Sequence, residues 1–333
     1  MKELRKDGRK YPYDAWLLWQ PLQRCNFDCR YCFHYGDPAK KTSEIKKIDI
    51  GALMETLDKT GKTFRIHFAG KGEPFLIPNI IEVCEALTKK HYIGFNTNLT
   101  SPKIREFADV IDPGRVVDFD ASCHIRELER HNLMDTYVEN FLLLKEAGFQ
   151  KTRGYAVAYP LKAEAVAYPP LAKEVEKYRS FFNKRGIELM FTYFMGTYNG
   201  KEYPASYTEK ELDVFCLDRE RLRTIYPYNK VCNAGFNAAT VDSNGNVRPC
   251  FQMAESIGNI YTKIKFNDNL TICPFKLCGC PLKDLDPFLF GKANEEIDSA
   301  EWPGAVTRFT SFLKDRKMWR KGRTATFINR LTQ

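Results

Sequence analysis

Short apolar runs alternate with longer amphipathic segments along residues 15–194. The apolar runs are rich in aromatic and β-branched residues and predict six strands, at 16–22, 63–69, 92–96, 115–122, 152–158 and 187–194. The segments between them predict helices at 49–60, 78–90, 102–110, 134–146 and 170–185, with Asp49 as the N-cap of the first. Strands that alternate with helices in this way form a parallel sheet, which right-handed crossovers curl into a barrel or a doubly wound layer.

The alternation ends near residue 200, where the chain reads YNGKEYPASYT and is dense in turn residues. The pattern contains six strand–helix units, whereas a closed barrel has eight units and takes roughly 250 residues. We therefore expect an α/β fold: a partial (β/α)6 TIM-like barrel over residues 1–200. A smaller cysteine-rich domain over 201–290 and a basic helical tail over 291–333 would follow it. Ligands of such a barrel lie beyond the carboxyl ends of the strands.

Composition indicates a globular protein with a sizeable core. The 333 residues are 44% hydrophobic and 28% charged, and the mean hydropathy is −0.44. No run approaches the 18 or so apolar residues of a membrane span, and the N-terminal MKELRKDGRK lacks the apolar stretch of a secretory signal. We therefore expect a cytoplasmic protein. Eleven cysteines are an odd number for a full disulfide set, and a reducing cytoplasm would keep them available as ligands.

The net charge of +9 is concentrated near the C-terminus. Residues 308–330 carry eight Lys or Arg residues against one Asp, with Phe309, Phe312, Leu313 and Trp319 at roughly helical spacing. Such a segment can attract nucleic acid, anionic lipid or a phosphorylated substrate. The interleaved apolar residues favour a docked amphipathic helix with a solvated basic face.

Three cysteines converge directly after the first predicted strand. Cys25, Cys29 and Cys32 stand in RCNFDCRYCFHYG with the spacing C-x3-C-x2-C. Thiolates select iron–sulfur clusters, zinc or cuprous ion, and a tetrahedral zinc ion would want a fourth ligand such as His34. A four-iron cluster held by three cysteines instead leaves one iron open to an outside chelator.

This motif, with Tyr31 before its last cysteine, resembles the signature of the radical S-adenosylmethionine (radical SAM) superfamily. The resemblance implies that Cys25, Cys29 and Cys32 hold a [4Fe-4S] cluster whose open iron binds S-adenosylmethionine (SAM). The reduced cluster would cleave SAM to a 5′-deoxyadenosyl radical, which takes a hydrogen atom from the substrate. An electron donor such as flavodoxin or ferredoxin is then an expected partner.

Companion motifs follow the second and third predicted strands. FAGKGEPFLIPN resembles the GGEP loop of the family and places Gly70, Gly72, Glu73 and Pro74 at the cofactor, with Glu73 implied to hold the methionyl amine of SAM. FNTNLTS resembles the third-strand segment of the family, in which Asn96 and Asn98 would bind ribose hydroxyls. Plain turns are the alternative for both segments.

The fourth predicted strand ends in VVDFDASCHIRELE. Alternation places Asp120, Ser122 and His124 on one face and Cys123 on the other. We predict that the polar face points into the barrel, with Ser122 at the cofactor and His124 as a candidate catalytic residue, although a buried histidine without chemistry is also consistent. Cys123 is a candidate hydrogen donor on its location near the barrel mouth.

A second set of five cysteines lies in residues 232–280: Cys232, Cys250, Cys273, Cys278 and Cys280. VDSNGNVRPC predicts a hairpin whose Asn-Gly turn brings Cys232 and Cys250 towards one another. The segment resembles the SPASM and twitch appendages of radical SAM enzymes, although it lacks the later cysteines of the full SPASM pattern. The resemblance implies one auxiliary [4Fe-4S] cluster with one cysteine spare, and a zinc knuckle is the alternative. We interpret Cys84 and Cys216 as packing residues.

These features predict a radical SAM enzyme, an oxidoreductase or epimerase, that acts on a polar small molecule. A carbohydrate-like, phosphorylated or nucleotide-linked substrate would suit the tyrosines and the basic tail. The second hypothesis is a peptide-modifying maturase of the SPASM/twitch group. A third, from another class, is a non-enzymatic metal-binding protein that binds nucleic acid through residues 308–330, which we do not favour.

Overall fold

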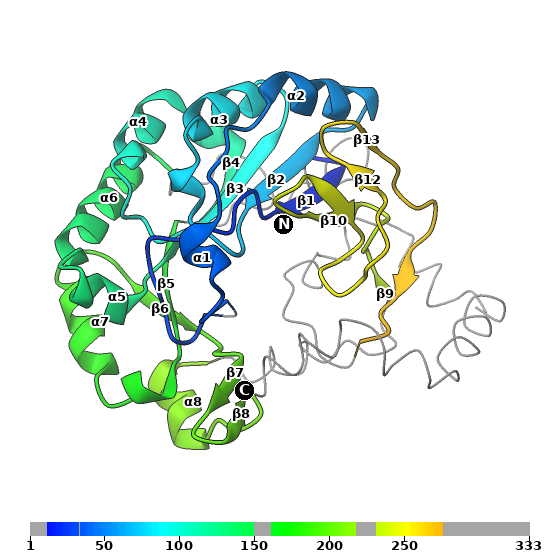
Figure 1. Ribbon diagram of the computed structural model, residues 1–333. Coiled ribbons are helices and arrows are strands. Elements are labelled where there is room, and N and C mark those ends of the chain that lie inside the picture. The colour runs from blue at the N-terminus through cyan, green and yellow to red at the C-terminus, as the bar shows by residue number, and fades with distance from the viewer. Residues whose placement is uncertain (1–11, 33, 150–160, 218–230, 276–333) are drawn as a thin grey trace, which may run out of the picture.

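The computed structural model describes residues 12–32, 34–149, 161–217 and 231–275. The predicted strand at 152–158, the basic tail, Cys278 and Cys280 lie outside these residues. Figure 1 shows the strands curled into an open half-barrel, with helices over its outer face. None of the described helices is long and apolar enough to cross a membrane.

Six parallel strands form the barrel wall, in the order of the chain: β1 (Ala15–Trp19), β2 (Phe64–Phe68), β3 (Tyr92–Thr97), β4 (Val116–Ser122), β5 (Lys162–Val166) and β6 (Leu189–Thr192). The predicted partial barrel is thus confirmed. The strand that pairs with β4 and β6 begins at Lys162, whereas the pattern placed this strand at 152–158.

The helices of the wall lie close to their predicted positions: α2 (Ile50–Lys59), α3 (Ile80–Thr88), α4 (Lys103–Val110), α6 (Met134–Glu146) and α7 (Val175–Asn183). Asp49 caps α2 as predicted, since its side chain accepts a hydrogen bond from the backbone N–H of Ala52 at 3.0 Å. Two short helices were not predicted, α1 (Ala39–Thr42) and α5 (Ile125–Arg130), and α8 (Glu209–Phe215) follows the barrel. Single 3₁₀ turns lie at Pro74–Leu76, Pro113–Arg115 and Pro169–Leu171.

The main core lies between the sheet and these helices. Phe68, Phe75, Phe95, Phe107 and Phe119 are all buried, and the ring centroids of neighbouring pairs lie 5.0–5.7 Å apart. Aromatic pairs at such distances add to the free energy of burial. Because side chains alternate across a strand, the residues between these phenylalanines face the opposite side of the sheet, the barrel interior.

The sheet continues beyond the barrel wall. Strand β10 (Ala238–Val241) pairs in parallel with β1, and β11 (Asn246–Arg248), β12 (Gly258–Asn259) and β13 (Lys263–Ile264) extend it antiparallel. The hydrogen-bonded sheet therefore crosses the boundary that we predicted near residue 200. Strands β10 and β11 form the predicted hairpin, with Gly245 in the left-handed conformation at φ +81°.

Two small sheets complete the described fold. Strands β7 (Gly196–Tyr198) and β8 (Lys201–Tyr203) form a hairpin after β6, and β14 (Thr271–Ile272) pairs with β9 (Val231–Cys232). The packing role of Cys84 is confirmed, because its side chain is fully buried on α3. The same expectation was wrong for Cys216, which is exposed and ends α8 in the left-handed conformation at φ +53°.

Candidate active site

The three early cysteines lie in one loop at the carboxyl end of β1, which we call the cysteine loop (residues 25–32). The loop is built from tight turns, in which the N–H of Cys32 donates to the carbonyl of Cys29 at 3.0 Å. The backbone N–H of Phe27 donates to Sγ of Cys25 at 3.4 Å, and that of His34 donates to Sγ of Cys32 at 3.5 Å. Backbone donors aimed at sulfur stabilise the thiolate that a metal ligand must be.

The cysteine loop is docked against α5. Glu127, which is 6% exposed, accepts a hydrogen bond from the N–H of Asp28 at 2.9 Å and forms an ion pair with Arg130. Phe27 stacks on His131, with ring centroids 5.6 Å apart. A carboxylate and an aromatic ring from one short helix thus hold the segment between the first two cysteines.

The charges around the thiols show what binding a metal requires. Burial raises the pKa of Cys25 to about 11 and that of Cys29 further, so both are neutral thiols near pH 7 in the metal-free chain. A bound metal must therefore displace these protons.

The spacing of the sulfur atoms discriminates between a single ion and a cluster. Sulfur ligands of one tetrahedral zinc ion lie about 3.8 Å apart, given Zn–S distances of about 2.3 Å. Within the described part of the chain, the one group of three potential ligands whose atoms all lie within 4.8 Å is His67, Asp118 and Asp120. The three sulfur atoms of the cysteine loop therefore do not all lie within 4.8 Å of one another, a wider spread than that of the sulfur ligands of one zinc ion.

The GKGEP loop packs directly against the segment that leads into the cysteine loop. A Cβ atom at Gly72 would lie 2.4 Å from the carbonyl oxygen of Arg24, and the N–H of Glu73 donates to that oxygen at 3.0 Å. Gly70 has φ +107°, and a Cβ there would meet the Gln20 side chain. Both glycines are thus required by close approach, and Pro74 opens the 3₁₀ turn that follows.

Glu73 is buried and saturated with hydrogen bonds. Its carboxylate accepts from Oγ1 of Thr97 at 2.6 Å and from the N–H groups of Asn98 and Phe75 at 2.8 and 3.2 Å. Burial raises the pKa of Glu73 to about 7, although these donors act in the opposite direction. The carboxylate therefore joins the GKGEP loop to the end of β3, and its contact with the SAM amine stays a prediction.

The two candidate ribose ligands after β3 have different surroundings. Asn98 is buried and donates to Oδ1 of Asn26 in the cysteine loop at 2.7 Å, so it ties β3 to that loop. Asn96 is half-buried in the barrel interior, and its side chain contacts Nε2 of His67. Of the two, Asn96 is the side chain that lies towards the interior and is reachable by a ligand.

His124 and Tyr31 form a pair that sequence reasoning did not anticipate. The Tyr31 hydroxyl lies 3.0 Å from Nδ1 of His124, and burial lowers the pKa of His124 to about 4. His124 is thus a neutral residue that supports the aromatic side chain beside Cys32. The contact agrees with a buried, hydrogen-bonded histidine, and a catalytic role of His124 stays a prediction.

Ser122 and Cys123 face opposite sides of the sheet, as the alternation predicted. Ser122 is half-buried on the interior face, in register with Glu164 of β5. Cys123 is 1% exposed within the main core, and burial raises the pKa of its thiol. Cys123 therefore packs in the main core, and its role as a hydrogen donor stays a prediction.

The barrel interior contains a buried polar layer that we did not predict from the sequence. Arg65 donates to Oδ2 of Asp118 at 2.6 Å, and Nδ1 of His67 lies 3.0 Å from the same oxygen. The Arg65 guanidinium also lies 3.9 Å from the centre of the Trp16 ring. The signal was present in FRIHF, where Arg65 and His67 alternate with three core residues.

The second cysteine set lies at the other end of the barrel wall. Cys232 precedes β10, which runs parallel to β1, and Cys250 follows β11, which returns antiparallel. Both therefore lie towards the N-terminal ends of the parallel strands, whereas the cysteine loop follows the carboxyl end of β1. Cys273 follows β14, which pairs with β9 at Cys232, so three of the five thiols gather there.

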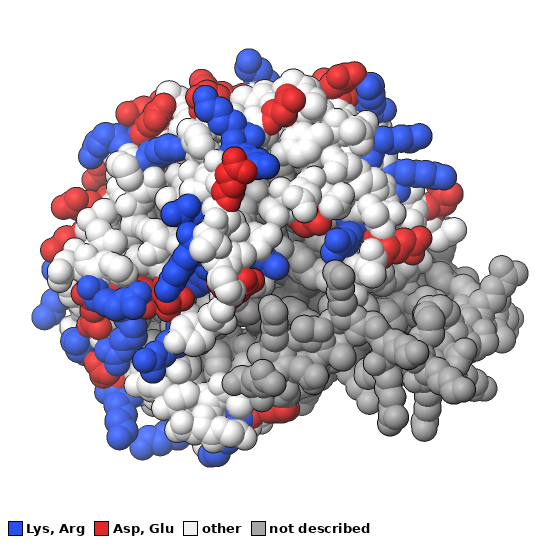
Figure 2. Space-filling model, in the orientation of Figure 1, with Lys and Arg blue, Asp and Glu red and all other residues white. Residues whose placement is uncertain are grey.

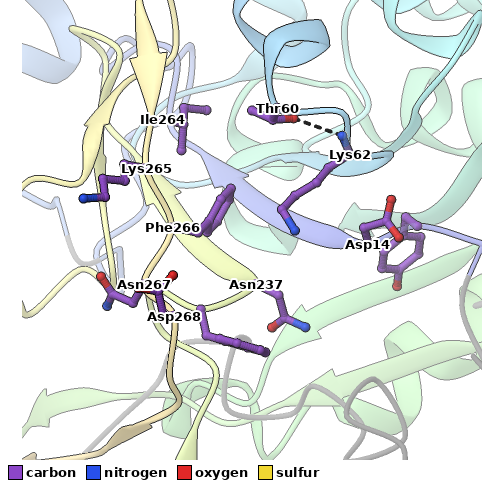
Figure 3. A pocket seen from close by; sticks show the side chains of 11 residues that line it. Asp14, Thr60, Lys62, Asn237, Ile264, Lys265, Phe266, Asn267 and Asp268 are labelled. Atoms are coloured by element: carbon purple, nitrogen blue, oxygen red, sulfur yellow. Dashed lines mark hydrogen bonds between the residues drawn. The ribbon is translucent and has the colours of Figure 1, made fainter.

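A cavity of about 600 Å³ lies at this same N-terminal end (Figure 3). It is lined by residues that precede β1, β2 and β10, including Asp14, Lys62 and Asn237, and by Ile264 at the end of β13 with residues 265–268 after it. The cavity is separate from the cysteine loop, and we do not include it in the active site.

Comparisons with known proteins agree with this geometry. Residues 19–161 match the model of the radical SAM superfamily. The structure is similar to native anSMEcpe with bound AdoMet, at 18% identity over 74% of this chain and 78% of that chain, with a TM-score of 0.50. A histidine-tagged form of anSMEcpe with bound AdoMet matches at 19% identity over the same shares, with a TM-score of 0.51. At such identities the likeness concerns the fold alone. The search of curated proteins gave no match.

Proposed function

We propose that the chain is a radical SAM enzyme that abstracts hydrogen from a polar small-molecule substrate inside the half-barrel, on the support of the family match over residues 19–161. When bound, the [4Fe-4S] cluster and SAM would supply a 5′-deoxyadenosyl radical, the species that abstracts hydrogen from the substrate. The observation that carries the proposal is the convergence of three widely spaced thiols, the GKGEP loop and the end of β3 at one edge of the sheet.

The side chains around this edge bind and orient the cofactors. Cys25, Cys29 and Cys32 hold the cluster, and Asn98 fixes the cysteine loop relative to β3 through Asn26. Gly70 and Gly72 let the backbone approach SAM closely. Asn96, on the interior side, is the candidate ligand of the SAM ribose.

The barrel interior supports a polar substrate. Its described side chains include Asn96, Asp120, Ser122 and Glu164 in a half-buried layer, above the buried Arg65, His67 and Asp118. A hydroxyl or amino group on the substrate finds acceptors in this layer. A carbohydrate-like molecule meets that requirement, and a phosphate or nucleotide group would have to lie outside the carboxylate-bearing layer.

We propose one auxiliary [4Fe-4S] cluster at the second cysteine set. Cys232, Cys250 and Cys273, which lie at the end of β1 opposite the cysteine loop, would hold this cluster. When bound, it would supply a one-electron acceptor, which suits an oxidised product. The burial of Cys123 favours this outcome over epimerisation, which needs a hydrogen donor on the interior side.

Peptide modification is the second candidate, on one structural observation. Strand β6 ends the described sheet, and the edge of such a strand can pair with an extended peptide. The face of the molecule drawn in Figure 2 offers less support for nucleic-acid binding, because Lys and Arg are interspersed there with Asp and Glu.

Deuterium transfer tests the proposed function directly. The anaerobically reconstituted protein, with dithionite, flavodoxin or ferredoxin as electron donor, is incubated with SAM and deuterated candidates from the sugar, aminocyclitol and peptide classes. We expect deuterium in 5′-deoxyadenosine with a polar small molecule. Transfer from peptides alone would establish the second candidate, and absence of SAM cleavage by the reduced protein would refute the radical SAM proposal.

The auxiliary cluster has its own test. We expect the Cys232→Ala, Cys250→Ala variant to lose about half of the bound iron and to keep reductive SAM cleavage, because the cysteine loop is untouched. The Cys25→Ala, Cys29→Ala variant should lose cleavage completely. Retention of all iron by the Cys232→Ala, Cys250→Ala variant would refute the second cluster.

A further inference from the structure

Lys40 is a buried cation beside the cysteine loop. It lies in α1 and is 3% exposed, whereas its neighbour Lys41 has a side chain that is 72% exposed. The backbone carbonyl of Lys40 accepts a hydrogen bond from the N–H of Cys25 at 3.1 Å, so α1 is held directly against the first cysteine. Burial of an ammonium group is costly unless a negative charge compensates it.

The described acidic partner of Lys40 compensates it only in part. Oδ1 of Asp28 lies 3.8 Å from Nζ of Lys40, but the other carboxylate oxygen lies 3.1 Å from Nζ of the exposed Lys41. Asp28 thus serves two cations, and its side chain is 29% exposed.

The ammonium of Lys40 lies beside the segment that carries the first two cysteines. Its partner Asp28 directly precedes Cys29, and the backbone carbonyl of Lys40 accepts from the N–H of Cys25. Binding of a cluster converts the three thiols to thiolates and supplies the negative charge that the buried ammonium lacks.

We propose that Lys40 is the internal counter-charge of the cluster in the cysteine loop and raises its reduction potential. This inference rests on the proposed function. Reduction adds one electron, and so one negative charge, to a centre that three thiolates already make anionic. A buried cation nearby stabilises the reduced form more than the oxidised form, and net charge is one of the quantities that set the potential of such clusters. In this proposal Lys40 acts through its charge on the cluster and does not contact the substrate.

The test is a potentiometric titration of the reconstituted full chain without SAM, followed by electron paramagnetic resonance. The signal that changes when SAM is added afterwards identifies the cluster of the cysteine loop. We expect Lys40→Met to keep its iron and to shift the midpoint by about 59 mV or more to negative potential, a tenfold change in the one-electron equilibrium constant. Lys40→Arg, which keeps the charge, and Lys41→Met, which removes an exposed charge, should both stay close to the unsubstituted protein.

Other outcomes separate this inference from the proposed function. If Lys40→Met does not fold, Lys40→Gln offers a neutral polar side chain in the same place, and the same negative shift is expected. An unchanged midpoint in a folded, iron-loaded neutral variant overturns the role of Lys40 and leaves the proposed function standing. Failure of the unsubstituted protein to take up a four-iron cluster would overturn the proposed function itself.

Discussion

Glu73 shows how a single buried side chain couples the site to pH. Its carboxylate is 3% exposed and bound to three donors from two segments. Burial nevertheless raises its pKa from the ordinary 4.5 to about 7. Between these two values the folded chain binds more protons than the unfolded chain, so the free energy of unfolding falls as pH rises.

We expect the Glu73 contribution to the free energy of unfolding to decrease by about 3 kcal/mol between pH 4.5 and 7, at 1.36 kcal/mol for each unit of pKa difference. Urea denaturation of the metal-free protein at a series of pH values measures this slope. Glu73→Gln should flatten it, and Glu85→Gln, on the exposed side of α3, should not. Parallel pH profiles for the unsubstituted protein and Glu73→Gln would contradict the shifted pKa.

The residues of the site were predictable to the extent that local motifs carry them. The spacing of Cys25, Cys29 and Cys32 and the glycines of GKGEP identified the loop region, because such motifs are defined by neighbours in sequence. The His124 contact with Tyr31 and the Lys40 contact with Asp28 join separate elements, and only the folded chain shows them. Alternation along FRIHF would have revealed Arg65 and His67, had the interior face been followed strand by strand.

At the scale of elements, periodicity predicted the barrel wall well because its strands and helices are long enough to carry a repeat. The two helices that it missed, α1 and α5, have four and six residues, which is too short for a periodic pattern. Both pack against the cysteine loop, α1 through Lys40 and α5 through Glu127. The elements that hold the site in place were thus the least visible in the sequence.

The docking of α5 gives a prediction at this scale. Glu127→Ala removes the buried carboxylate that accepts from Asp28 N–H and pairs with Arg130. We expect a loss of about 2 kcal/mol in the free energy of unfolding, since hydrogen bonds to a charged group are worth about 1.5–3 kcal/mol. The variant should also release iron to a chelator several-fold faster than the unsubstituted protein.

Glu176→Ala is the matched control for α5. Glu176 pairs with Arg179 within α7, a helix that no contact described above joins to the cysteine loop. Its side chain is 84% exposed, and such exposed ion pairs contribute about 0–1 kcal/mol to stability. Equal rates of iron release from the two variants would show that α5 does not hold the cysteine loop.

At the scale of the whole molecule, one sheet joins the strand that leads into the cysteine loop to the hairpin that precedes Cys250. Strand β10 pairs with β1 over four register positions, from Trp16 opposite Ala238 to Trp19 opposite Val241. The hairpin turn after β10 returns to the active-site end, where Nε2 of Gln23 donates to Oγ of Ser243 at 3.2 Å. Sequence alternation ended near residue 200 and gave no sign of this pairing, because strand order across a long connection is not a local property.

The β1–β10 pairing predicts that the barrel does not fold well without the segment that follows it. A chain that ends at residue 217 would leave β1, the strand that leads into the cysteine loop, as a sheet edge with unpaired backbone groups. It would also uncover Leu17 and Trp19, which pack in the core that includes Ala239 and Val241. Exposed hydrophobic edges of this kind favour aggregation. We therefore expect residues 1–217 to be largely insoluble, or to unfold at a clearly lower urea concentration than the full chain, when both are expressed and denatured in parallel.

A point substitution separates loss of the strand pairing from loss of the rest of the segment. Ala239→Pro removes a backbone donor from β10 in the middle of its ladder with β1, opposite Leu17. If the shared sheet holds the barrel together, this variant should approach the truncated chain in stability and should lose iron from the cysteine loop as well as from the second set. If instead the two parts are independent, Ala239→Pro should lose iron from the second set alone, and residues 1–217 should remain soluble with SAM cleavage intact. The distribution of the lost iron between the two sites therefore shows whether the barrel and the segment after it are stable only together or independently of one another.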